Sequence, residues 1–340
     1  MEAEGTGDMI PSARFYNTYH GHLPEDLERL ESHLRGKGKR ILFLAGDSSA
    51  DNKYWFSDKA KALNGYESIL RPPTSKRDIA HCVNAELQRR GRPDLAAVNC
   101  AVEESKVSSR DCGALLPQDR FIRDHISAED ILVVSVGGND IALASSPCTI
   151  SSMLALLCCS SASCIDRCAA GCDIPLVCDP FCCGGSCIGC MSNCCACPPG
   201  MGYFVHLFKT RIENYLLKLV EKKKPKIIGV CMIYYPCETA NGSWADGVLG
   251  VLGYNKNPAK LQALIRSVFL LATSRIQLPG VEVVPIPLFE VLDGKCDADY
   301  EQRVEPSASG GEKLADLLLN HVLDDCVPTD PAASSNREQD

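Results

Sequence analysis

The sequence predicts an α/β protein with three layers, in which helices cover both faces of a mostly parallel five-stranded sheet. Two observations predict this α/β/α sandwich. Short apolar runs of strand length alternate along the chain with longer segments whose apolar residues recur at helical spacing. The run over residues 131–136 is almost entirely apolar and mostly β-branched, which is typical of a central strand buried on both faces. Such alternation favours parallel strands joined by right-handed crossovers.

The first half of the chain supplies three strands and two helices. A helix is expected over residues 24–34, because its leucines lie at helical spacing and its first turn is acidic, which suits the helix dipole. The first strand covers residues 40–45, where an apolar run too short for a helix ends at Gly-Asp-Ser. A helix over 78–90 and a strand over 94–100 follow, and 131–136 is the third strand.

The second half continues the alternation. Helices are expected over residues 205–221 and 258–273, and strands over 227–234 and 281–286. A final helix over residues 309–321 has a serine start signal and leucines along its inner face. These elements complete the predicted five-stranded sheet.

One domain accounts for most of the chain. With 340 residues, 45% of them apolar and 23% charged, the chain is long enough for a single large core. We expect residues 1–147 and 199–326 to form one α/β domain, 148–198 to form a cysteine-rich insertion, and the polar residues 327–340 to be a disordered tail. The insertion falls between the third strand and the next long helix, so the domain closes around it without losing an element.

The net charge and the first residues of the chain limit the expected partners and cellular location. A net charge of −8 argues against a nucleic-acid partner, which normally requires a basic face. The first residues lack a basic segment followed by an apolar stretch, so no secretory signal is expected. No apolar run has the length of a membrane-spanning helix. The expected location is therefore cytoplasmic, with membrane association only through modified cysteines.

The insertion is defined by its cysteines, since fourteen of the chain's 21 lie between residues 148 and 197. Three interpretations stay open. Disulfides would require an oxidising compartment. S-acylation fits paired cysteines among apolar residues and would tether the protein to a membrane. Zinc fits thiolates two residues apart, which can reach one tetrahedral centre around a tight turn. The candidate zinc ligands are Cys187, Cys190, Cys194 and Cys197.

Three polar motifs follow predicted strands or precede the last helix. Ser48 follows the first strand, Asn139 follows the third, and Glu305 precedes the final helix. The carboxyl ends of parallel strands meet at one edge of a sheet, where ligands bind in open α/β folds. We therefore expect these three side chains to gather at the same edge.

The motifs resemble those of the SGNH, or GDSL, hydrolase superfamily, whose fold is a flavodoxin-like three-layer sandwich. Its first block, Gly-Asp-Ser, is matched by residues 46–48, and its third, Gly-x-Asn-Asp, by residues 137–140. Its last block, Asp-x-x-His-Pro-Ser, is replaced here by residues 302–307, which read Gln-Arg-Val-Glu-Pro-Ser. The resemblance covers most of the chain outside the insertion and implies hydrolysis of a small-molecule acyl ester without a cofactor.

The resemblance implies a role for each motif residue. Ser48 would be the nucleophile, and the oxyanion would be held by the Ser48 N–H, the Asn139 amide and backbone N–H groups near Gly138 and Glu104. In the second block, residues 99–105, the expected glycine is missing and carboxylates lie nearby, which opposes an oxyanion. Without the resemblance, Ser48 could equally cap a helix and Asn139 could bond its own turn.

The last block replaces the general base. Glu305 stands where the histidine is expected, and Gln302 stands where the orienting aspartate is expected. The formal charge of the pair is kept, and the Gln302 amide could donate to the carboxylate. An ordinary glutamate, with a pKa of about 4.3, is a weaker base than histidine unless burial raises its pKa. Alternatively, Glu305 caps the last helix or pairs with Arg303.

Residues beside the nucleophile are expected to shape the substrate pocket. These are Asp47, Asp51 and Asn52, although such residues also occur for turn geometry alone. The sequence thus predicts a serine esterase or acyl hydrolase with an altered base. The alternatives are a catalytically inactive ligand-binding relative and a scaffold tethered to a membrane or loaded with metal through its cysteines.

Overall fold

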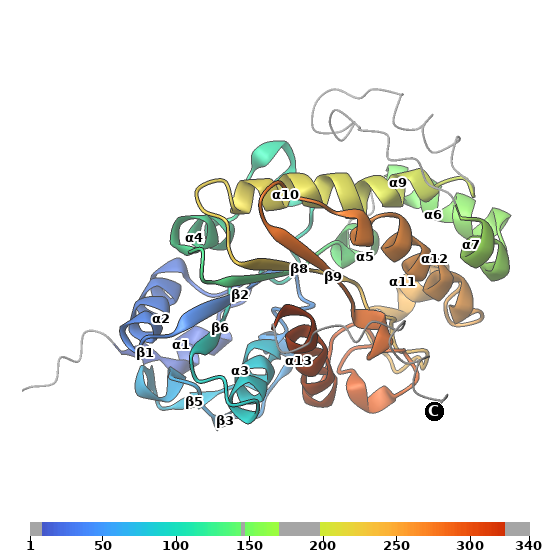
Figure 1. Cartoon of the computed structure of the whole chain (residues 1–340). Coiled ribbons are helices and arrows are strands. Elements are labelled where there is room, and N and C mark those ends of the chain that lie inside the picture. Colours follow the sequence, from blue (N-terminus) through green and yellow to red (C-terminus); the bar gives the residue numbers. More distant parts are fainter. Residues whose placement is uncertain (1–8, 144–146, 170–197, 324–340) are drawn as a thin grey trace, which may run out of the picture.

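The five-stranded parallel sheet is the centre of the molecule. The structure is a computed structural model that describes residues 9–143, 147–169 and 198–323 (Figure 1). The strands run in the order β6-β2-β7-β8-β9, and every neighbouring pair is parallel. The predicted α/β/α fold class is confirmed. The strands are β2 (Arg40–Gly46), β6 (Leu95–Asn99), β7 (Ile131–Ser135), β8 (Ile227–Met232) and β9 (Glu282–Pro287).

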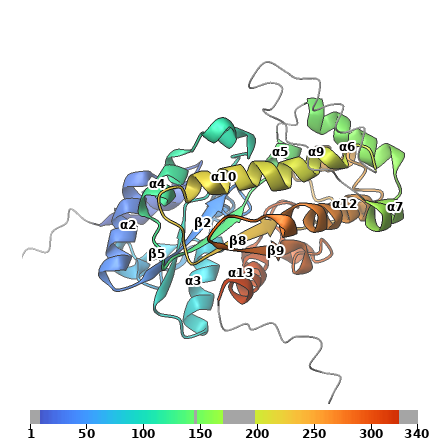
Figure 2. The same ribbon diagram turned by 45° about the horizontal axis from the view of Figure 1, so that its top comes forward.

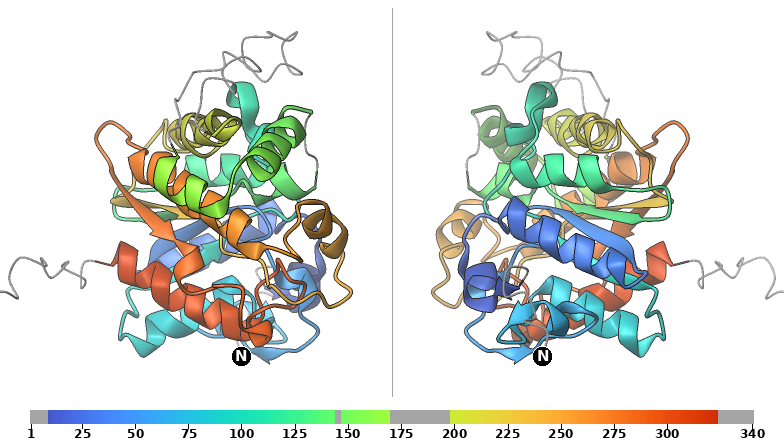
Figure 3. Two further views of the ribbon diagram at one scale, coloured as in Figure 1. Left: turned by 90° about the vertical axis from the view of Figure 1, so that its right-hand side faces the viewer. Right: turned by 90° about the vertical axis from the view of Figure 1, so that its left-hand side faces the viewer.

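Helices cover the two faces of this sheet, as two views in Figure 3 show. All the helices predicted from periodicity are present, and one further helix, α4, joins them. One face carries α2 (Pro24–Gly36), α4 (Pro117–His125), α10 (Ile212–Leu219) and α12 (Pro258–Leu271). The other face carries α3 (Ile79–Arg89) and α13 (Ala308–Val322).

The strand residues divide alternately between two cores. On β2, Ile41 and Phe43 join the core beneath α2 and α10, whereas Leu42 and Leu44 join the core beneath α3 and α13. This follows from the two-residue repeat of a strand, which sends successive side chains to opposite faces. Because both faces are buried, β2 has no polar side chain between its first residue and the loop that follows it.

The helix predicted over residues 205–221 has an irregularity in its middle. It consists of α9 (Met201–His206), a π-helical turn η4 (Leu207–Arg211) and α10, which together form one long rod in Figure 2. Phe208, on the π-helical turn, contacts Gly137 after β7: a β-carbon at Gly137 would lie 2.7 Å from the Phe208 ring. Local irregularities of this kind are frequent near functional sites.

Short elements escaped prediction because they have too few residues to show a period. They are α1 (Ser12–Asn17), α5 (Gly138–Ala142), α11 (Asp246–Val251), the parallel pair β1 (Ile10–Pro11) and β4 (Leu70–Arg71), and the antiparallel pair β3 (Ala60–Lys61) and β5 (Thr74–Ser75). Two of them, α5 and α11, line the candidate site described below.

The start of the predicted insertion is helical and packs on the α/β domain. Helices α6 (Pro147–Cys159) and α7 (Ala162–Cys168) lie against α9 and α12. Met153, Leu156 and Ile165 are buried in the same core as the sheet. The Ser267 hydroxyl on α12 donates to the Ile165 carbonyl at 3.0 Å, which fixes α7 against the domain.

The rest of the predicted insertion lies outside the described residues, as do the tail 327–340 and the candidate zinc ligands Cys187, Cys190, Cys194 and Cys197. Within the described ranges, His, Cys, Asp and Glu side chains form no group of three suited to a metal ion. None of the helices described combines the length and the apolar character needed to cross a bilayer. The zinc, acylation and disulfide interpretations stay predictions.

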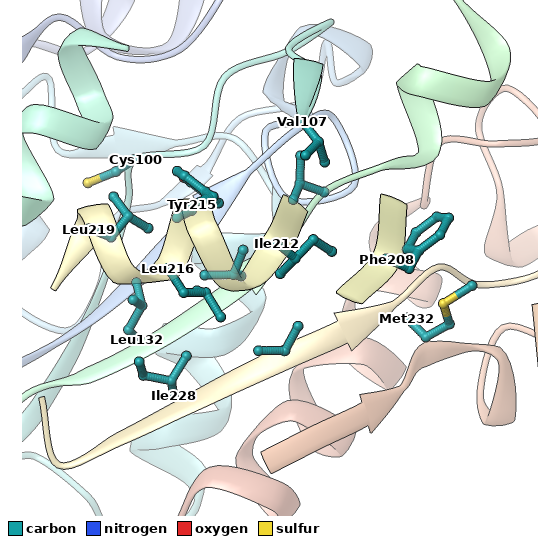
Figure 4. Close-up of a cluster of buried hydrophobic side chains, with 14 of the residues drawn as sticks. Cys100, Val107, Leu132, Phe208, Ile212, Tyr215, Leu216, Leu219, Ile228 and Met232 are labelled. Carbon is teal, nitrogen blue, oxygen red and sulfur yellow. The ribbon is translucent and has the colours of Figure 1, made fainter. Parts of the chain in front are cut away.

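The packing of α10 on the sheet gives a direct test of the fold. Figure 4 shows Leu216 and Leu219 of α10 above Leu132 of β7 and Ile228 of β8. Leu216→Ala should lower the free energy of unfolding by about 2 to 5 kcal/mol, because it leaves a cavity in this core. The neighbouring Leu217, which is 46% exposed, supplies the control. Leu217→Ala should change the free energy of unfolding by less than about 0.5 kcal/mol in the same urea titration. Equal losses of stability in the two variants would contradict this packing of α10.

Candidate active site

The site is built on a close approach between the ends of β2 and β7. Gly46 ends β2 with a φ of 130°, and a β-carbon there would lie 1.7 Å from the Ser135 carbonyl oxygen. Only glycine can occupy this position, because it accepts a positive φ and brings no side chain. The chain then turns away from the sheet, which places Asp47 and Ser48 above its carboxyl edge.

The Asp47 carboxylate joins the loops that follow these two strands. Its Oδ1 accepts hydrogen bonds from the Ser49 N–H at 3.0 Å and the Ser49 hydroxyl at 2.7 Å. Its Oδ2 accepts one from the Gly137 N–H at 3.1 Å. Burial raises the pKa of Asp47 despite these donors. Asp47 borders the pocket, as predicted for a pocket residue, but its two oxygens serve mainly to fix the loop of Ser48 to the loop of Asn139.

Ser48 and Glu305 meet across the edge of the sheet. Ser48, Glu305 and Asn139 line one pocket, and the Ser48 hydroxyl is near enough to the Glu305 carboxyl to lower its pKa. Ser48 is partly exposed and Glu305 is buried. The three side chains that the sequence predicted to gather at this edge therefore do so.

Glu305 has neither of its alternative roles. The last helix is capped by Ser307, whose hydroxyl accepts from the Gly310 N–H at 3.2 Å. Arg303 pairs with Asp246 at 2.8 Å instead of Glu305. Among the described residues Glu305 has no ion-pair partner, and its Oε2 accepts no hydrogen bond. The carboxyl is thus left to interact with Ser48 and the pocket.

Three side chains hold the loop that carries Glu305. The Arg303 guanidinium is fully buried and donates to the Cys237 carbonyl at 3.0 Å, while its backbone has a φ of 55°. The Tyr234 hydroxyl donates to the Val304 carbonyl at 2.6 Å. The Asn52 amide donates to the Pro306 carbonyl at 3.0 Å. These contacts fix the backbone on both sides of Glu305, and nothing in the sequence motifs indicated Tyr234 or Arg303.

Gln302 does not take the place of an orienting aspartate. Its backbone carbonyl accepts from the Ser243 hydroxyl at 3.0 Å, and its half-buried side chain forms no hydrogen bond with Glu305 or any other described residue. The predicted amide contact between Gln302 and Glu305 is absent from the described part of the chain. The position of Glu305 depends on its loop and not on a neighbouring side chain.

The pKa of Glu305 lies well above the ordinary value for a glutamate. Burial is the largest cause, and the nearby carboxyl groups of Glu103 and Asp47 raise it further. The hydrogen bond from Ser48 lowers it, but by less. A carboxyl with a raised pKa is a stronger base once ionised, so this environment moves Glu305 toward the basicity of a histidine.

Donors for an oxyanion are only partly assembled. Asn139 is buried and its Nδ2 donates to the Ser105 carbonyl at 3.1 Å, which leaves one amide hydrogen for the pocket. The Ser48 N–H has no acceptor among the described residues. Gly138 lines the pocket, whereas Glu104 does not.

Glu104 lies in the second block, residues 99–105, and has an unusual backbone conformation. Its φ is 60°, in the left-handed region that disfavours side chains. The carboxylate accepts from the Tyr19 hydroxyl at 2.9 Å and is exposed to solvent. The carboxylate that faces Glu305 is instead that of Glu103.

Asp51 and Asn52 are fully buried and do not line the pocket. Asp51 pairs with the buried Lys53 and accepts from the Glu103 N–H at 2.9 Å. Asn52 accepts from the Ile79 N–H at 3.1 Å in addition to its bond to Pro306. Both side chains join the loop after β2 to its neighbours, so in this structure they support the pocket walls and are not placed to touch a substrate.

The pocket itself is largely apolar. It encloses about 100 Å³, and its polar rim is formed by Asp47, Ser48, Ser49, Asn139 and Glu305. The opposite wall comes from α11, α12 and the residues before them. It includes Trp244, Val248, Leu249, Leu252, Leu261 and Ile265. None of the seven histidines, all of which are among the described residues, lines this pocket.

No protein-family model matches the sequence, and a search of curated proteins finds no match. Similar solved structures include a putative GDSL-like lipase from Parabacteroides merdae, with a TM-score of 0.40 and 11% identity over 83% of this chain and 94% of that chain. They also include an acetyl xylan esterase from Geobacillus stearothermophilus, with a TM-score of 0.39 and 15% identity over 83% and 94% of the two chains.

A further similar structure is phospholipase A1 from Streptomyces albidoflavus, with a TM-score of 0.39 and 11% identity over 83% of this chain and 99% of that chain.

The buried acids near the site make stability depend on pH. Burial raises the pKa of Asp78 from 3.8 to about 7, and Asp78 caps α3 by accepting from the His81 N–H. Between about pH 4 and pH 7, Asp78 is therefore protonated in the folded state and ionised in the unfolded state. The free energy of unfolding falls as the pH rises through this range, and each unit of difference in pKa corresponds to about 1.4 kcal/mol.

Asp78→Asn removes this titration and keeps the helix cap. Urea unfolding across this pH range should show a weaker loss of stability with rising pH than in the wild type. Part of the slope should remain, because burial also raises the pKa of Glu103 to about 7. A slope equal to that of the wild type would contradict the assignment to Asp78.

Proposed function

We propose that this chain is a serine ester hydrolase of the SGNH type in which Glu305 replaces histidine as the general base. One observation carries the proposal: Ser48, the buried Glu305 and Asn139 line the same pocket, with the Ser48 hydroxyl beside the Glu305 carboxyl. A nucleophile beside a base and a donor for the oxyanion is the arrangement that acyl transfer requires.

In the first half of the reaction, the Ser48 oxygen attacks the acyl carbonyl while Glu305 accepts the hydroxyl proton. The resulting oxyanion is stabilised by the Asn139 amide and the Ser48 N–H. When the tetrahedral intermediate collapses, the bond to the alcohol breaks and Glu305 returns the proton to the departing alkoxide. In the second half, Glu305 deprotonates water, and the resulting hydroxide attacks the acyl-serine. The bond to Ser48 then breaks, Glu305 returns the proton to the Ser48 oxygen, and the carboxylic acid leaves.

The environment of Glu305 decides whether this chemistry is effective. General-base assistance is worth about 10² to 10⁴ in rate, and most of it would be lost with a base as weak as an exposed glutamate. Burial and the neighbouring Glu103 and Asp47 raise the pKa of Glu305, which recovers basicity. The same neighbours give the pocket a negative character, so neutral acyl groups fit it better than anionic ones.

A second candidate is a ligand-binding protein that lost catalysis. Two observations favour it: Gln302 does not orient Glu305, and the Glu305 Oε2 has no donor among the described residues. Such a protein would bind an ester in the same pocket and release it unchanged, so turnover that depends on Ser48 separates the two functions.

The roles of Ser48 and Glu305 are tested with chromogenic short-chain esters. Ser48→Ala should abolish turnover, and Glu305→Gln should lower kcat by about 10² to 10⁴, because the amide cannot accept the serine proton. Glu301→Gln, an exposed change in the same loop, and Ser57→Ala, at an exposed serine, are the matched controls. Wild-type turnover in Ser48→Ala would contradict the proposal, and absence of turnover in the wild type would favour the ligand-binding protein.

The identity of the base is tested by the pH dependence of kcat/KM. The value of kcat/KM should rise with pH as Glu305 ionises. The midpoint of this rise should lie above the ordinary range of a carboxyl group, because the pKa of Glu305 is raised. Glu103→Gln removes a negative neighbour and so stabilises the ionised form of Glu305. The midpoint should therefore move to lower pH in this variant. A midpoint that stays in place, or moves to higher pH, would show that Glu305 is not the titrating base.

A further inference from the structure

A second apolar cavity continues the pocket that contains Ser48. It encloses about 290 Å³ and is lined by residues of α5, α6 and α11. Four residues, Ile141, Ala142, Val248 and Leu252, line both cavities, so only their side chains separate the two spaces. We call the second cavity the α6–α11 groove. Its position makes it an extension of the reacting centre and not a separate site.

Among the residues that the structure describes, no charged side chain lines the α6–α11 groove. From α6 come Ile150, Met153 and Leu154, and α11 adds Val251. The one hydroxyl in the lining is that of Thr149, which is already hydrogen-bonded to the Tyr203 hydroxyl at 2.6 Å. A polar or ionised ligand would therefore lose its hydrogen bonds to water without replacing them, whereas an alkyl chain has no such bonds to lose.

Exposed apolar side chains concentrate around this groove. Ile150 is 49% exposed, Leu154 is 47% exposed and Val251 is 80% exposed, and all three line it. Trp244, which is 38% exposed, lines the adjoining Ser48 pocket. Scattered exposed apolar residues need no explanation, but a group around one groove marks a binding site for an apolar ligand.

We infer that the α6–α11 groove binds the alkyl chain of the acyl group, so that the preferred substrates are esters of unbranched medium-chain acids. The inference rests on the proposed function. With its carbonyl at Ser48 and Asn139, an acyl group has the apolar wall of the pocket directly ahead of it. Acetyl and butyryl groups end within this first pocket, whereas a longer chain passes Val248 and Leu252 and enters the groove.

Val248 is the specificity-determining position in this arrangement. It is partly exposed on α11 and borders both cavities, so a larger side chain there narrows the space between them. Val248→Trp should therefore lower the turnover of long acyl chains more than that of short ones. Leu217→Trp, at an exposed leucine of α10, is the matched control.

The first measurement compares p-nitrophenyl acetate, butyrate, octanoate and decanoate. In Val248→Trp, kcat/KM for octanoate and decanoate should fall by about tenfold or more, because several methylene groups lose their apolar contacts. The value for acetate should fall by less, so that the ratio of octanoate to acetate turnover drops, and Leu217→Trp should match the wild type for every ester. Equal effects of Val248→Trp on acetate and octanoate would overturn the inference.

The second measurement does not depend on catalysis. Octanamide and acetamide are neutral and resist hydrolysis, and their binding to the full chain is measured by calorimetry. Octanamide should bind about tenfold or more tightly than acetamide, since its alkyl chain is buried, and Val248→Trp should remove this preference. Octanamide binding without any ester turnover would overturn the proposed hydrolase and keep the groove. Turnover of acetate that requires Ser48, without an octanamide preference, would overturn the groove and keep the hydrolase.

Discussion

The Asp47 carboxylate is the interaction on which the site depends. It lies where β2 and β7 end, and its two oxygens bind donors from both loops, at Ser49 and at Gly137. It adds to two further bonds between the strand ends, from the Asp47 N–H to the Ser135 carbonyl at 2.9 Å and between the Ser49 and Ser135 hydroxyls at 2.6 Å. The close approach at Gly46 brings the loops together, and Asp47 then fixes their relative position. Because this carboxylate is buried, its bonds are not weakened by competing water.

The fold was predictable because its signals are long and repeated. Each strand of the sheet is an apolar run bounded by turn residues, and each long helix has a clear apolar face, so their boundaries agree with the structure to within a few residues. The elements that escaped prediction have few residues or depend on tertiary packing. The π-helical turn around Phe208 is an example, since its cause is the contact with Gly137 from a distant part of the chain.

The site was predictable in its outline and not in its contacts. Motif order and strand ends placed Ser48, Asn139 and Glu305 at one edge, which is a property of the backbone. The partners of the side chains could not be predicted, because closeness in sequence does not determine which way a side chain points. Asn52 lies four residues after Ser48, yet its side chain donates a hydrogen bond to the Pro306 carbonyl. Gln302 lies three residues before Glu305, yet its backbone carbonyl accepts from Ser243 and its side chain does not bond to Glu305. Tyr234 belongs to no motif and Arg303 is not one of the residues that define the last block, so only the folded chain shows that they hold the loop of Glu305.

That loop has a consequence for how such a site can evolve. The bonds that hold it involve backbone atoms of residues 301–307 or the side chains of Arg303 and Ser307, and none involves the Glu305 side chain. The residue proposed as the base therefore takes no part in the hydrogen bonds that hold its own loop. In evolutionary terms, the side chain at this position can change by a single substitution without removing any of these bonds.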